Sequence, residues 1–129
     1  MGINWSRHPR VADVRPKGAK KRMFSWQPAG IPEITPDELK ARLKQGEDLL
    51  IIDVREPMEV VTGKIPGAIN IPLSQLPRRL HEIDPEKEAI LVCRSGSRSF
   101  YAAQFLQANG FSKVKNLAGG MISWDGEIE

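Results

Sequence analysis

The chain has 129 residues, a net charge of +3 and a single cysteine, and 40% of its residues are hydrophobic. This length supports one hydrophobic core, and one cysteine excludes an internal disulfide framework or a zinc cluster of cysteines. No apolar run is long enough for a membrane span or a secretory signal, which predicts a cytoplasmic protein.

The charge is unevenly distributed along the chain. Residues 1–30 hold seven Lys or Arg and one Asp, a net charge of +6, which leaves −3 on residues 31–129. Prolines and a scarcity of aliphatic side chains make independent folding of this basic arm unfavourable. We therefore predict an N-terminal arm, 1–30, followed by one domain, 31–129. We expect Trp5, Phe24 and Trp26 to dock the arm on the domain. Alternatively, the arm contacts RNA or an acidic carrier protein, or it is a transit peptide.

The domain begins with clear local signals. Thr35 and Glu38 form a capping box with proline at the first helical position, and Gly46 ends the predicted helix. The continuous apolar run 49–52 is typical of a strand buried on both faces, and it ends at Asp53. A short helical turn is then expected from Pro57.

The remaining elements alternate between strands and helices. After a short strand at 68–71, Ser74 is expected to cap a helix with Leu76 and Leu80 inside. Further strands are predicted at 89–92 and 113–117, with a helix between them. The inner face of that helix is expected to hold Tyr101, Ala102, Phe105 and Leu106. A last helix would begin with Met121, Ile122 and Trp124, with the tryptophan as a core anchor. This order predicts an α/β fold, a parallel sheet with helices on both faces.

Cys93 lies where the apolar run 89–92 meets the following helix. Ligands bind at the carboxyl ends of parallel strands, and a helix N-terminus stabilises an anion there by roughly 0.3–1 kcal/mol. Arg94 and Arg98, if they flank the sulfur, would lower the thiol pKa further. The two histidines, His8 and His81, lie in the arm and on a predicted surface helix, so a Cys/His dyad is not expected.

Four stretches of the chain resemble the rhodanese family of sulfurtransferases. They are the cysteine loop 93–99, the segment 53–56, the segment 63–72, and the glycine pair with its tryptophan in 117–124. Together they cover about residues 31–124, in the family's order. The resemblance implies that sulfur is carried as a persulfide on Cys93, and that Asp53 and Arg55 hold neighbouring loops in place. Asp53 has a plainer interpretation as a cap of the turn that follows.

The sequence departs from the family's usual pattern at Lys64, where the family mostly has histidine. If that histidine secures the turn, the lysine must do so by a different contact or leave the turn looser.

The loop itself predicts how an anionic sulfur is held. Its backbone N–H groups from Arg94 to Ser99 would form a nest, with Gly96 allowing a positive φ and Ser95 and Ser97 adding hydroxyl donors. The two arginines of the loop, Arg94 and Arg98, would bind an anionic donor such as thiosulfate. Cys93 would take the donor's outer sulfur and pass it to cyanide or a thiol, with no metal or organic cofactor.

Two alternatives remain open at this point. A sulfur-relay module would use the same persulfide but receive sulfur from a partner protein docked by the basic arm. A cysteine phosphatase or arsenate reductase also places a thiolate and an arginine on a strand-loop-helix, but with five intervening residues, whereas Cys93 and Arg98 are separated by four.

Overall fold

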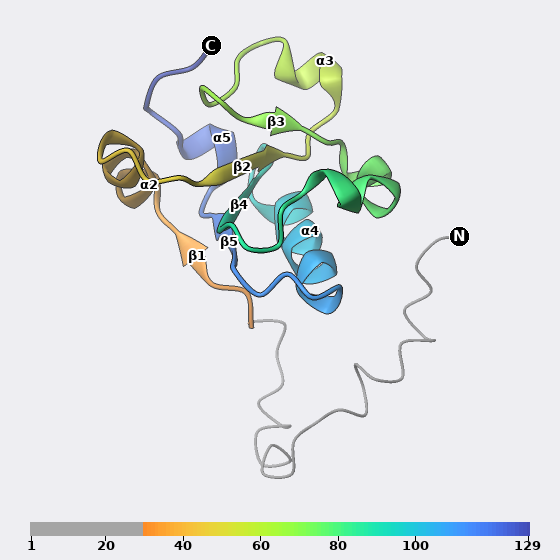
Figure 1. Ribbon diagram of the computed structural model, residues 1–129. Coiled ribbons are helices and arrows are strands. Elements are labelled where there is room, and N and C mark those ends of the chain that lie inside the picture. Colours follow the sequence, from red (N-terminus) through yellow and green to blue (C-terminus); the bar gives the residue numbers. More distant parts are fainter. Residues whose placement is uncertain (1–29) are drawn as a thin grey trace. The chain divides into compact units, whose positions relative to one another are not determined.

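The computed structural model describes residues 30–129, and within them Ile31–Glu129 form one compact unit. Five strands make one sheet in the order β1-β5-β4-β2-β3, and every neighbouring pair is parallel (Figure 1). The strands are β1 (Glu33–Ile34), β2 (Leu50–Asp53), β3 (Ile69–Asn70), β4 (Ala89–Val92) and β5 (Val114–Leu117). The central strand β4 therefore runs between β2 and β5, so the carboxyl ends of these two strands flank its own. The parallel α/β prediction is confirmed.

Helices cover both faces of the sheet, as predicted. α2 (Pro36–Lys44) and α5 (Gly120–Ser123) lie on one face, and the 3-10 helix η4 (Leu73–Glu82) and α4 (Ser97–Ala108) lie on the other (Figure 1). The short α3 (Pro57–Val60) belongs to the connection between β2 and β3. On the first face, Leu39 of α2 packs with Ile51 and Ile90 of the two central strands. No described helix is both long enough and apolar enough to cross a membrane.

The capping box of α2 forms as predicted. The Thr35 amide donates to Glu38 Oε1 at 2.9 Å, and the Glu38 amide donates to Thr35 Oγ1 at 3.1 Å. The helix ends at its C-cap Gln45, and Gly46 follows with φ +76°. The capping box and the glycine thus predict correctly where this helix begins and ends.

Three detailed predictions were wrong. Ser74 does not cap a helix, because η4 begins at Leu73 with Pro72 as its N-cap and contains Pro77, which lacks the N–H of a regular α-helix. Tyr101 is 62% exposed, because the buried positions of α4 are 99, 102, 103, 105 and 106. Trp124 lies outside the last helix, because α5 ends at Ser123 with Trp124 as its C-cap; it is partly buried and packs against the core, as predicted.

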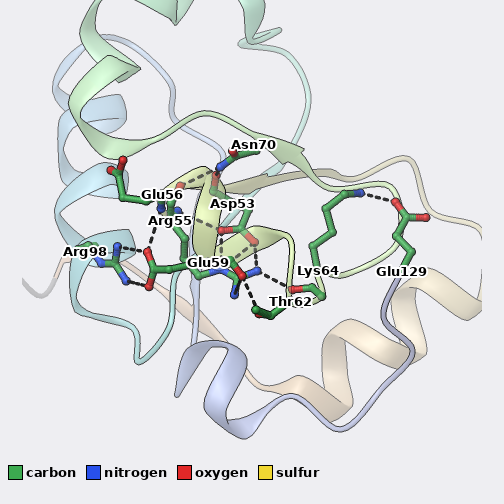
Figure 2. Close-up of polar contacts among 10 residues, drawn as sticks. Asp53, Arg55, Glu56, Glu59, Thr62, Lys64, Asn70, Arg98 and Glu129 are labelled. Carbon is green, nitrogen blue, oxygen red and sulfur yellow. Dashed lines mark hydrogen bonds and ion pairs between the residues drawn. The ribbon is translucent and has the colours of Figure 1, made fainter.

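A buried ion pair ties β2 to the connection that follows it. Asp53 is fully buried and Arg55 is 5% exposed, and the guanidinium donates to both carboxylate oxygens, Nη2 to Oδ2 at 2.7 Å. The same guanidinium donates to the Gly63 carbonyl at 2.8 Å and the Glu59 carbonyl at 3.4 Å. Asn70 on β3 adds hydrogen bonds to the carbonyls of Asp53 and Arg55, each 2.9 Å (Figure 2). These contacts fix α3 against the end of β2.

We expect Asp53→Ala to destabilise the domain by about 3–5 kcal/mol, because it leaves a buried guanidinium without its counter-charge. Chemical denaturation followed by circular dichroism measures the loss. The control is Glu82→Gln, which removes one charge from the more exposed pair with Arg79 and should cost at most about 1 kcal/mol. Equal losses in the two variants would contradict the importance of the buried pair.

Candidate active site

The Cys93 sulfur lies beyond the carboxyl end of β4, under a loop that enters α4. The residue is 1% exposed. The Gly96 amide donates to Sγ at 3.1 Å, and the Ser99 hydroxyl lies 3.3 Å from it. Gly96 has φ +105°, a conformation in which its amide can turn toward the sulfur without the strain of a side chain. The loop therefore surrounds the sulfur with hydrogen-bond donors.

These donors decide the acidity of the thiol. Burial alone raises the pKa of Cys93, but hydrogen bonds from the Ser99 hydroxyl and from the amides of Ser99, Gly96 and Ser95 outweigh it, so the pKa lies below its ordinary value. The charge of Arg98 also interacts with the sulfur, but the hydrogen bonds are the larger causes that lower the pKa of Cys93. Of the loop amides that were expected to point at the sulfur, those of Ser95, Gly96 and Ser99 lower its pKa, and they do so as hydrogen-bond donors.

Asn116 on β5 supports two of these groups, and sequence analysis missed it. The residue is 2% exposed; its Nδ2 donates to the Gly96 carbonyl at 3.0 Å, and its Oδ1 accepts from the Ser99 hydroxyl at 2.5 Å. One hydroxyl proton thus serves two acceptors, Oδ1 and Sγ, and we expect it to turn to the sulfur when the thiol ionises, since bonds to charged acceptors are stronger. The available signal was a polar side chain two residues after Val114, and therefore on the same face of the predicted strand.

The glycine pair after β5 brings α5 against the same loop. The amides of Met121 and Ile122 donate to the carbonyls of Cys93 and Arg94 at 2.9 and 3.0 Å. A Cβ on Gly120 would lie 2.5 Å from the Arg94 carbonyl oxygen, so only glycine allows this approach. The sequence indicates a tight turn here, and the structure adds that the turn supports the cysteine loop.

Arg98 makes a different contact from the one expected. Its guanidinium pairs with both carboxylate oxygens of Glu59 on α3, at 2.8 and 2.9 Å (Figure 2). Hydrogen bonding to Arg98 is the main cause that lowers the pKa of Glu59 to about 2, so this carboxylate is ionised at neutral pH. The positive charge of Arg98 is thereby balanced within the protein. Glu59 itself was not predicted, because its partner is 39 residues away.

Arg94 behaves in the opposite way. Its side chain is exposed, and it makes no hydrogen bond or ion pair with any residue in 30–129. It lines a pocket of about 480 Å³ beside the loop, together with Arg55, Met58, Glu59, Thr62, Met121 and Ile122. Ser95 and Ser97 are exposed on the loop, and their hydroxyls make no hydrogen bond with the described residues.

Lys64 secures its turn by a different contact from a histidine. Its ammonium pairs with the Glu129 carboxylate, and the two residues exchange backbone hydrogen bonds of 3.2 and 2.8 Å. Figure 2 shows the pair of Lys64 with Glu129, and the same carboxylate accepts from the Gly67 amide at 3.2 Å. The turn that contains Lys64 is therefore held by the chain's last residue, away from the cysteine loop.

We expect Ser99→Ala to raise the pKa of Cys93, because it removes a donor that stabilises the thiolate while the neutral S–H is only a weak donor. The rate of alkylation by iodoacetamide against pH should then rise at a higher pH than in the unmodified protein. Ser97→Ala, which changes an exposed hydroxyl of the same loop, should leave that pH profile in place. An unshifted profile in Ser99→Ala would rule out the hydroxyl as a donor to the sulfur.

Gly120→Ala should be more destabilising than Gly46→Ala. Both glycines have positive φ, +58° and +76°, so both substitutions carry a similar backbone strain of about 1 kcal/mol. Only at position 120 does the new Cβ meet backbone atoms, while position 46 is open. Unfolding in denaturant measures the difference, and equal effects would show that α5 can move away from the loop at no cost.

Known proteins resemble this chain in both sequence and fold. A "Sulfurtransferase" from Allochromatium vinosum is 39% identical over 94 residues, which cover 73% of this chain and 88% of that protein. The crystal structure of a rhodanese-like domain protein from Staphylococcus aureus has a TM-score of 0.72 and 36% identity, covering 77% of this chain and 97% of that one. A thiosulfate sulfurtransferase structure from Pseudomonas aeruginosa has a TM-score of 0.71 and 30% identity, covering 78% of this chain and 20% of that one. The Rhodanese-like domain matches residues 35–127. The chain therefore belongs to the rhodanese-like domain family.

Proposed function

We propose that this protein is a sulfurtransferase that moves sulfane sulfur from thiosulfate or a similar anionic donor to a thiophilic acceptor, cyanide or a thiol, through a persulfide on Cys93. The observation that carries the proposal is the set of donors around Sγ, with the Gly96 amide at 3.1 Å and the Ser99 hydroxyl at 3.3 Å. Such donors stabilise a sulfur anion in either form, thiolate or persulfide. Sulfurtransferases among the relatives and structural neighbours support the same reaction class.

The reaction takes two displacement steps. In the first, the Cys93 thiolate attacks the outer sulfur of thiosulfate, a sulfur–sulfur bond forms, and sulfite leaves with the electron pair of the broken bond. In the second, the acceptor attacks the outer sulfur of the persulfide and the Cys93 thiolate returns. Because Cys93 is 1% exposed, the donor's outer sulfur has to enter beneath the rim of the loop. The chain has no second cysteine, so sulfur passes directly to an external acceptor.

The residues around the thiol have separate roles in this proposal. Gly96, Ser99 and the Ser95 amide hold the anionic sulfur, and Arg94 attracts the anionic donor because its guanidinium has no partner among residues 30–129. Ser97 lies on the exposed rim of the loop. Arg98, with Glu59, fixes the first turn of α4. Asp53 and Arg55 act as positioning residues that hold the segment bearing Glu59.

The relay alternative uses the same persulfide and differs in the donor. The basic arm, 1–30, that would dock a partner protein lies almost entirely outside the described residues, so its role stays a prediction, as does a cytoplasmic location. A phosphatase reaction is less favoured, because the short loop directs its donors at a single sulfur atom and Arg98 is already paired with a carboxylate.

Intact-mass spectrometry after exposure to thiosulfate tests the proposal. The unmodified protein should gain the mass of one sulfur atom, and subsequent treatment with a thiol should remove it. Cys93→Ser should show no gain and should unfold at a similar denaturant concentration. A gain that survives in Cys93→Ser would exclude the mechanism. No gain in the unmodified protein would exclude thiosulfate as donor, and a gain that requires a persulfidated protein would establish the relay.

A further inference from the structure

The charges around the pocket beside the cysteine loop, which Arg94 and Glu59 line, largely cancel one another. Arg55 is balanced by the buried carboxylate of Asp53, and Arg98 by the carboxylate of Glu59. Only Arg94 contributes a guanidinium with no counter-charge among the described residues. Of the three arginines near the cysteine loop, only Arg94 is therefore without a paired carboxylate among the described residues.

Glu59 matters most for this balance, because its side chain both pairs with Arg98 and lines the pocket. The Glu56 amide donates to Glu59 Oε1 at 2.9 Å, and the Thr62 hydroxyl donates to the Glu59 carbonyl at 2.7 Å. The Glu56 amide and the Arg98 guanidinium thus hold the carboxylate, and the Thr62 hydroxyl holds the backbone of the same residue (Figure 2). Because Glu59 is held on Arg98, an incoming dianion gains no net attraction from that arginine.

The pocket also has an apolar rim. Met58 on α3 is 81% exposed and Ile122 on α5 is 64% exposed, and both line the pocket. An inorganic anion has no group that would bury these side chains. A donor with a carbon substituent can cover them, and the buried apolar area adds to its binding free energy.

We infer that this pocket selects singly charged organic sulfane-sulfur donors, R–S–S⁻ or an equivalent, over doubly charged inorganic ones, and that Glu59 is the residue that sets the preference. The inference rests on the proposed persulfide chemistry of Cys93 and names its donor class. The unpaired guanidinium of Arg94 matches one negative charge on the donor, and Met58 and Ile122 would contact its carbon group. Because Glu59 cancels the charge of Arg98, a second negative charge on the donor finds no further positive charge to offset it.

Two donors of the same chemistry test the inference, thiosulfate with two negative charges and methanethiosulfonate with one. In both, the Cys93 thiolate attacks the outer sulfur, a new sulfur–sulfur bond forms, and the donor's own sulfur–sulfur bond breaks. The electron pair leaves on sulfite or on methanesulfinate, so no oxidant or reductant is consumed. Because the leaving groups differ in reactivity, the quantity of interest is the ratio of kcat/KM for thiosulfate to that for methanethiosulfonate, compared between variants.

Glu59→Gln should raise this ratio about three- to tenfold, the size expected when one partly screened unit charge acts on one extra charge of the donor. Arg94→Gln should lower it by a similar factor, and its exposed, unpaired side chain makes a folding defect unexpected. The double variant restores the net charge and should return the ratio to within about twofold of the unmodified protein. Glu82→Gln, in the Arg79 pair outside the pocket, is the matched control and should leave the ratio unchanged.

The outcomes separate this inference from the proposed function. Ratios that stay equal across Glu59→Gln and Arg94→Gln, while the Cys93 persulfide still forms, would overturn the charge selection and leave the sulfurtransferase intact. Absence of the persulfide with both donors would overturn the proposed function itself. If Glu59→Gln unfolds, the Arg94→Gln ratio decides: a fall supports the inference, and no change contradicts it.

Discussion

The site depends on a buried ion pair that lies away from the sulfur. Removing Asp53 and Arg55 from water carries a large desolvation cost, which several hydrogen bonds between the two side chains and to the Gly63 carbonyl offset. The geometry is therefore fixed, because any displacement would leave a buried charge with incomplete partners. This rigidity extends to α3 and so to Glu59, whose carboxylate determines how much of the positive charge of Arg98 a donor encounters.

At the sulfur itself, two opposing effects meet. Burial of Cys93 favours the neutral thiol, whereas the amides and hydroxyl that surround it favour the anion, and the latter prevail. Directional donors at 3.1–3.3 Å stabilise a thiolate without placing a formal positive charge against it. Arg94 consequently remains available for the donor. Asn116 makes this arrangement stable, because it anchors both the Gly96 carbonyl and the Ser99 hydroxyl.

The sequence predicts those features whose causes are local. The capping box of Thr35 and Glu38 and the continuous apolar strand before Cys93 each depend on neighbouring residues, and each is found in the structure. Tyr101 was placed wrongly because α4 buries a face that only its contact with β4 and β5 defines. The partners Glu59 and Asn116 could not be identified from spacing, since they lie 39 and 17 residues from the loop residues that they hold.

The pairing of Arg98 with Glu59 also resolves a conflict between local rules. A cation in the first turn of a helix is unfavourable, because it faces the positive end of the helix dipole, and α4 has no acidic residue in its own first turn. α3 supplies the missing carboxylate across space. Glu59 thus offsets the unfavourable interaction of Arg98 with the helix dipole, and in the proposed selection of donors the same carboxylate limits the positive charge available beside the pocket.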